Sequence, residues 1–197
     1  MTIRLTILVL ISVVGIGCGG MPVMESIADV EQALDKHKLM KQPDLTYFEE
    51  PELVHADAGF QSLIRPDGYT WEEIALEGQK PQTWVGPIVI YFYENPDDIP
   101  RGVEVLKTLR RDKGYKVYDE ETQQATMESE GVAQGPQPEC HRELHPNGVH
   151  ITKICLAFEG NVLIHTMAYP EAGIGFRLLD EPALERMLDD LRDGVPD

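Results

Sequence analysis

The last third of the chain contains three apolar stretches with the alternation of β-strands, and they constrain the fold more than any other feature. They cover residues 139–144, 149–158 and 162–169. Gly160-Asn161, between the second and third stretches, is a typical two-residue hairpin connection. His145-Pro146-Asn147-Gly148 separates the first two stretches. We therefore expect an antiparallel meander of three strands.

One face of this meander is strongly apolar and needs a covering element. With Gly160-Asn161 as the turn, the residues that share this face are Ile154, Leu156, Phe158, Leu163, His165, Met167 and Tyr169. Residues 180–193 are the candidate cover, with Asp180 as a good N-cap and Gly194 after the end. The apolar side of this helix consists of Leu184, Met187, Leu188 and Leu191. We expect His165 to be a core or rim histidine.

The middle of the chain gives further strand and helix signals. Residues 83–94 are apolar on both faces, which is typical of a strand buried on two sides, and Pro87 belongs at its start or at a bulge. Two aspartates and a proline then open a helix that Gly114 ends. Its inward-facing residues are expected to be Val103, Val105, Leu106 and Leu109. A strand over 115–118 and a long polar loop over 119–138 follow.

The segment from residue 25 to residue 76 carries weaker patterns. Residues 25–41 predict an amphipathic helix with one narrow apolar stripe, formed by Ile27, Val30 and Leu34. The remaining elements are expected to be a strand over 45–48, an acidic loop over 49–58, and a hairpin of 60–65 with 69–76 around Pro66-Asp67-Gly68.

This order of elements predicts an α+β fold, in which an antiparallel β-sheet has helices packed on it as in an α/β/α sandwich. The 197 residues fit a single domain, which we place at residues 25–197. The strand–helix–strand–strand–strand–helix series from Val85 to Arg192 resembles the PsbP-like proteins, the extrinsic photosystem subunits and their bacterial relatives. That resemblance implies a binding or assembly-factor scaffold without a shared catalytic centre.

The amino terminus has the pattern of an export signal. One cation, Arg4, precedes an apolar run over residues 5–16. A helix of this length is about 18 Å long at 1.5 Å per residue, whereas the hydrocarbon core of a bilayer is about 30 Å thick. The run therefore predicts a signal segment rather than a transmembrane helix.

Gly15-Ile16-Gly17-Cys18, at the end of this run, resembles the lipobox of bacterial lipoproteins. The resemblance implies a signal peptide over residues 1–17, cleavage before Cys18 and a lipid on its sulfur. Residues 18–24 would then be a short tether. Gly19 after the cysteine points to the outer membrane in an organism that has one. An ordinary cleaved signal and an uncleaved anchor are the alternatives.

With Cys18 lipidated, Cys140 and Cys155 are the remaining thiols, and an oxidising compartment favours their pairing. A four-residue loop over 146–149 places these two cysteines opposite each other on adjacent strands. A three-residue loop over 146–148 points them to opposite faces. We favour the first register and a structural disulfide.

The same segment supports an alternative, because thiolate and imidazole groups are ligands that zinc and copper prefer. The candidate ligands of such a metal site are Cys140, His141, His145 and His150. Their spacing matches no known ligand motif, and His141 and His145 would lie about 13 Å apart along one strand. We therefore expect neither a metal nor another cofactor. A metal-handling or hydrolytic envelope enzyme that uses this segment is the alternative function.

The charge of the chain excludes nucleic acid as a partner. Seventeen basic and 34 acidic side chains give a net charge of −17, which repels polyanions. A protein partner is expected to present a basic surface.

The sequence carries no motif for nucleophilic catalysis or phosphate binding, so we assign no catalytic residue. It predicts a non-catalytic binding or accessory module of the cell envelope, held at the membrane by acyl chains on Cys18.

Overall fold

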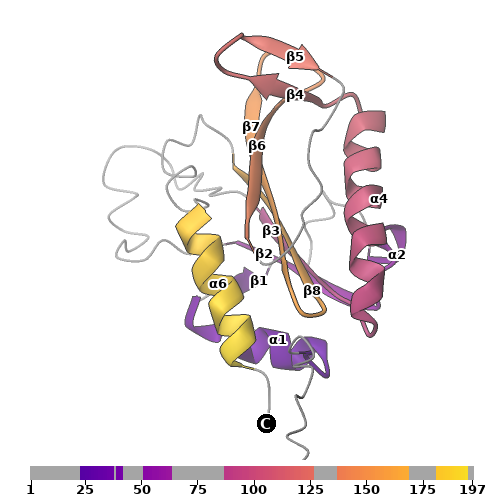
Figure 1. Ribbon diagram of the computed structural model, residues 1–197, viewed down its shortest axis with the longest axis vertical. Coiled ribbons are helices and arrows are strands. Elements are labelled where there is room, and N and C mark those ends of the chain that lie inside the picture. Colours follow the sequence, from indigo (N-terminus) through magenta and orange to yellow (C-terminus); the bar gives the residue numbers. More distant parts are fainter. Residues whose placement is uncertain are drawn as a thin grey trace, which may run out of the picture.

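The computed structural model describes residues 23–37, 39–41, 51–63, 87–126, 137–168 and 181–194. These residues form one eight-stranded antiparallel sheet with helices on both faces (Figure 1). The predicted α+β class and the layered, sandwich-like arrangement are therefore confirmed.

The strands are β1 (Met40–Lys41), β2 (Ala58–Leu63), β3 (Pro87–Phe92), β4 (Lys116–Asp119), β5 (Gln124–Thr126), β6 (Glu139–Leu144), β7 (Ile151–Glu159) and β8 (Val162–Ala168). The α-helices are α1 (Ile27–Ala33), α2 (Pro51–Val54), α4 (Ile99–Asp112) and α6 (Glu181–Asp193), with short 3₁₀ turns η1 (Asp35–His37) and η2 (Pro96–Asp98). The sheet order is β1-β2-β3-β8-β7-β6-β4-β5. In the described part of the chain, no helix is both long and apolar enough to cross a membrane.

Strands β3, β8 and β7 form the centre of the sheet and are buried on both faces. In β3, Ile88 and Ile90 belong to the core on one face, and Val89 and Tyr91 belong to the core on the other. The strand begins at Pro87, so the missing N–H of this residue falls at the end of the ladder rather than within it. The strand predicted over residues 83–94 is confirmed from Pro87 to Phe92, where it is buried on two sides, and residues 83–86 lie outside the described residues.

Each face of the sheet has its own helices. On one face, α1 and α6 pack against Cys155, Ala157, Val162 and Ile164. On the other face, α2 and α4 pack against Val89, Tyr91, Leu156 and Leu163. Figure 1 shows the two helical layers on either side of the sheet.

Helix α6 covers the opposite face of the meander from the one that the sequence predicts. The meander itself is confirmed, and Leu156 and His165 share a face as expected. However, α4 covers that face, through residues such as Leu106. The prediction is wrong because β7 and β8 are apolar on both faces. Alternation along such strands defines two faces but does not assign a helix to either of them.

Several short elements differ from the sequence predictions. The helix predicted over 25–41 ends at Ala33 and gives way to η1 and β1. Helix α2 lies in the predicted loop over 49–58, where Val54 is fully buried. Strand β5 lies in the predicted loop over 119–138. Strands β1 and β5 are two and three residues long, which is too short to produce a detectable alternation.

The hairpin predicted from residues 60–65 and 69–76 is wrong where the structure describes it. Ser62 and Leu63 pair with β1 on one side and with β3 on the other, so neither edge remains for the expected partner. Residues 69–76, and the strand predicted over 45–48, lie outside the described residues.

Asn161, in the β7–β8 turn, connects the segment before α1 to the sheet through hydrogen bonds. Its Oδ1 accepts a hydrogen bond from the backbone N–H of Met24 at 2.8 Å. Its Nδ2 donates to the carbonyl oxygens of Met24 at 2.9 Å and Tyr93 at 2.7 Å. All these polar groups are buried, and Asn161 is 1% exposed. The segment that precedes α1 is therefore held to the central strands.

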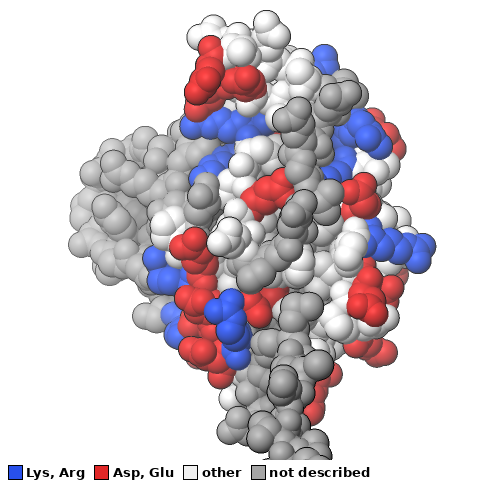
Figure 2. Space-filling model, in the orientation of Figure 1, with Lys and Arg blue, Asp and Glu red and all other residues white. Residues whose placement is uncertain are grey.

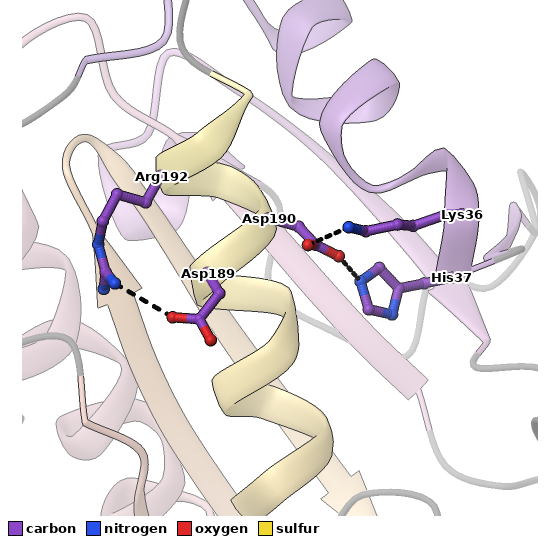
Figure 3. A network of polar contacts seen from close by, with 5 residues as sticks. All are labelled: Lys36, His37, Asp189, Asp190 and Arg192. Carbon is purple, nitrogen blue, oxygen red and sulfur yellow. Dashed lines mark hydrogen bonds and ion pairs between the residues drawn. The ribbon is translucent and has the colours of Figure 1, made fainter.

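A second contact joins this segment to α6. One carboxylate oxygen of Asp190 is paired with the Lys36 ammonium group, and the other lies 2.5 Å from Nε2 of His37 (Figure 3). Lys36 and His37 belong to η1. The carboxylate thus links η1 to the last turns of α6.

Candidate functional site: a cavity between helix α4 and the sheet

A small cavity between α4 and the sheet is the candidate site of this protein. Its volume is about 30 Å³, which is room for one or two water-sized groups. The polar side chains that line it include Lys107, Arg110, Arg111, Tyr115, His141 and Glu143. These polar side chains lie beside the apolar core on the α4 face of the sheet.

Helical spacing explains why α4 brings cations to the cavity. Lys107, Arg110 and Arg111 are three and four residues apart, so they lie on one side of the helix. Arg110 also continues the buried face that begins with Val103 and Leu106, and it is only 8% exposed. The sequence position of Arg110 therefore forces a permanent positive charge into the interface.

Glu143 of β6 balances the charge of Arg110. Nε of Arg110 donates to Oε2 of Glu143 at 2.6 Å, and Nε2 of His141 lies 2.9 Å from Oε1. The guanidinium group lies 4.0 Å from the centroid of the Tyr115 ring, a favourable cation–π arrangement. Its Nη1 contacts Sδ of Met167 at 3.1 Å. One carboxylate thus holds an arginine and a histidine together at the boundary of helix and sheet.

The surroundings of Glu143 act on its pKa in opposite directions. Burial alone would raise the pKa, because it disfavours the charged carboxylate. The hydrogen bond from His141 and the charges of Arg110 and His141 outweigh that effect, so the pKa of Glu143 lies below its ordinary value. Glu143 is consequently a carboxylate at neutral pH and a weak proton acceptor.

Two buried nitrogen atoms of the cavity have no hydrogen-bond partner among the described residues. They are Nη2 of Arg110 and Nζ of Lys107. Nearly all buried polar groups in proteins are hydrogen-bonded, so two such donors in one cavity require an explanation. Figure 2 shows acidic groups over the β4–β5 turn, around α6 and along the side of the molecule where α4 lies.

The predicted disulfide joins β6 to β7. Cys140 lies opposite Cys155, with a Cα–Cα distance of 4.1 Å and the two sulfur atoms bonded. Leu144 lies opposite Ile151, which is the register given by the four-residue loop. Both cysteines pack with the core under α1 and α6. The bond therefore lies on the face of the sheet opposite the cavity.

The four residues of the alternative metal site are distributed over different surroundings. Cys140 is in the disulfide, and His141 contacts Glu143 on the other face of β6. The rings of His145 and His150 meet edge to face with centroids 6.3 Å apart. Across the described ranges, no group of three or more His, Cys, Asp and Glu residues is placed to hold a metal ion. Cys18 and the predicted signal peptide lie outside those ranges.

The sequence predicts His165 on this face, but its pattern does not reveal the cavity that His165 lines with Lys107, Arg110 and Glu143. A signal was present in α4, because Arg110 follows Leu106 by four residues on the apolar side of the helix. A charged residue at such a position is rarely buried without a partner. Sequence pattern alone does not identify Glu143 as that partner, since 33 residues separate the two.

Comparison with protein-family models, with curated proteins and with solved structures finds no match to this chain.

Proposed function

We propose that this protein is an extracytoplasmic, lipid-anchored lipoprotein that serves the cell envelope as a non-catalytic binding or accessory module. The observation that carries the proposal is the Cys140–Cys155 disulfide, which is consistent with an oxidising compartment. The chain has three cysteines. Their pairing leaves Cys18, in the lipobox-like segment, as the thiol available for acylation.

The N-terminal contacts fit such an anchor. Met24 is fixed to the body by Asn161, so residues 18–24 would span at most about 25 Å between the lipid and the folded domain. Two acyl chains hold a protein stably on a membrane, because each buried methylene contributes about 0.8 kcal/mol. Gly19 favours the outer membrane as the destination where one exists.

The chemistry of the cavity favours binding over catalysis. Glu143 is occupied by Arg110 and His141, and its lowered pKa makes it a poor general base. Arg110 is in turn held by Glu143 and Tyr115. A set of charged groups fixed in this way can recognise a ligand without transferring a proton. A binding scaffold without a catalytic centre is also what the resemblance to PsbP-like proteins implies.

The mass of the mature protein, purified from the envelope fraction, tests this proposal. We expect the loss of residues 1–17, the added mass of acyl chains on Cys18, and no free thiol at Cys140 or Cys155. A Cys18→Ser variant is the matched control and should lack the acyl mass while it retains the disulfide. Recovery of the chain from the cytosol with Met1 in place and an unmodified Cys18 would overturn the proposal. Reduced cysteines with one equivalent of bound zinc or copper would support the metal-handling enzyme instead.

A further inference from the structure

We propose that the cavity between α4 and the sheet binds the carboxylate group of a small ligand through Arg110 and Lys107. This inference rests on the binding function proposed above and names the chemical class of the ligand. The fold buries polar groups in the cavity that no hydrogen bond within the described residues satisfies.

Arg110 and Lys107 each present an unused donor. Nε of Arg110 donates to Glu143 and Nη1 contacts the sulfur of Met167, whereas Nη2 is buried with no hydrogen-bond partner among the described residues. Lys107 lines the same cavity, and its Nζ is buried with no hydrogen-bond partner in the part of the chain that the structure describes. A buried donor without an acceptor destabilises a fold, and a charged one does so more strongly. A ligand that accepts a hydrogen bond from each of the two nitrogens would remove this destabilisation.

The charge of the cavity favours an anion. Lys107, Arg110 and Arg111 contribute three positive charges, and Glu143 contributes one negative charge. The excess is positive although the whole chain has a net charge of −17. Partial burial strengthens the attraction between this excess and a single anion.

Size and lining favour a carboxylate over a larger oxyanion. A volume of about 30 Å³ accommodates the two oxygens of a carboxylate. Each oxygen can accept a charge-assisted hydrogen bond, one from Arg110 and one from Lys107. Leu106, Val117 and Leu156 form an apolar part of the lining. The cavity therefore takes the two carboxylate oxygens, and its apolar lining favours a ligand whose carboxylate is carried on a short apolar chain.

Titration of the purified full-length protein in non-ionic detergent, followed by NMR, tests the inference. Sodium butyrate and sodium phosphate are the probes, at constant ionic strength. The informative variant is Lys107→Met, because Lys107 carries no ion pair in the described structure and its loss leaves the Arg110–Glu143 pair intact. Lys116→Met is the matched control, since Lys116 is exposed on β4 and does not line the cavity.

We expect saturable binding of butyrate to the unmodified protein and to Lys116→Met, and a Kd at least about tenfold higher for Lys107→Met. Equal Kd values for the unmodified protein and Lys107→Met would overturn the assignment of the site. Equal weakening by both substitutions would overturn it as well, because it indicates diffuse attraction. Tighter binding of phosphate than of butyrate, or no saturable binding of either, would overturn the carboxylate class. Each result is independent of acylation, so it is distinguishable from failure of the mass experiment.

Discussion

At the scale of single residues, Glu143 joins Arg110 and His141 at the boundary of α4 and the sheet. Glu143 forms an ion pair with Arg110, and its other carboxylate oxygen contacts Nε2 of His141. The side chain of Glu143 is 8% exposed. Breaking a buried ion pair by removal of one partner leaves an uncompensated charge in the core. The residue therefore stabilises the fold whether or not a ligand is present.

The substitution Glu143→Gln is expected to lower the free energy of unfolding by about 3 kcal/mol at pH 7. Because the folded-state pKa of Glu143 lies below its ordinary value of 4.5, its ionisation adds stability that is complete above that value. This contribution disappears as the pH falls through the folded-state pKa. Urea unfolding between pH 3 and 7 should thus show the two proteins converging in acid. A difference that is independent of pH contradicts this account, and Glu104→Gln, at an exposed position of α4, is the control.

Gly102 is a second residue whose identity the packing requires. A Cβ atom at this position would lie 1.9 Å from the hydroxyl oxygen and 2.8 Å from Cζ of Tyr93. Alanine ordinarily stabilises a helix interior by about 1 kcal/mol relative to glycine. Here we expect Gly102→Ala to destabilise the protein by about 1–3 kcal/mol, measured by thermal unfolding. Added Tyr93→Phe should recover part of the loss, and a stabilised Gly102→Ala protein would refute the prediction.

At the scale of elements, α6 is held by charges at its end as well as by its apolar side. Asp190 and Asp189 are adjacent in sequence but face different surroundings (Figure 3). The Asp190 side chain is 10% exposed and contacts Lys36 and His37 of η1. The Asp189 side chain is 63% exposed and contacts only the neighbouring Arg192 among the residues drawn in Figure 3.

Asp190→Asn is therefore expected to lower the free energy of unfolding by about 1–2 kcal/mol, because a partly buried charge-assisted contact is lost. Asp189→Asn removes the same charge from a solvent-exposed pair and should change the stability by less than about 0.5 kcal/mol. Amide hydrogen exchange should become faster in η1 for the first variant and stay unchanged for the second. Equal effects of the two substitutions would show that the link between η1 and α6 contributes nothing specific.

The elements that the sequence could predict are those whose signal is local. The β6–β7 register followed from a four-residue loop, and the position of Pro87 followed from its missing N–H. The face covered by α6 could not be derived, since both faces of β7 and β8 are apolar. The cavity was missed because Arg110 and Glu143 meet only after β6 has paired beside β4. Long-range contacts of this kind leave no periodic pattern in a single sequence.

At the scale of the whole molecule, the disulfide acts mainly on the unfolded chain. It joins residues 15 positions apart, and a loop of this size corresponds to about 3 kcal/mol of lost entropy in the unfolded state. The double substitution Cys140→Ala/Cys155→Ala should lower the free energy of unfolding by about that amount. Cys18→Ser, as the control, should not alter it. A double variant as stable as the parent in guanidinium unfolding would contradict the prediction.

The fastening of Met24 by Asn161 has a consequence for access to the cavity. The contact fixes the chain at α1, and α1 and β5 lie towards opposite ends of the long axis of the molecule (Figure 1). The C-terminal half of α4 lies towards the β5 end, and by the bounds of the helix Lys107 and Arg110 belong to this half. A protein attached by its amino terminus would then stand with α1 nearest the head groups and with the cavity farther from the membrane. Solutes of the aqueous space would reach the cavity without first partitioning into lipid.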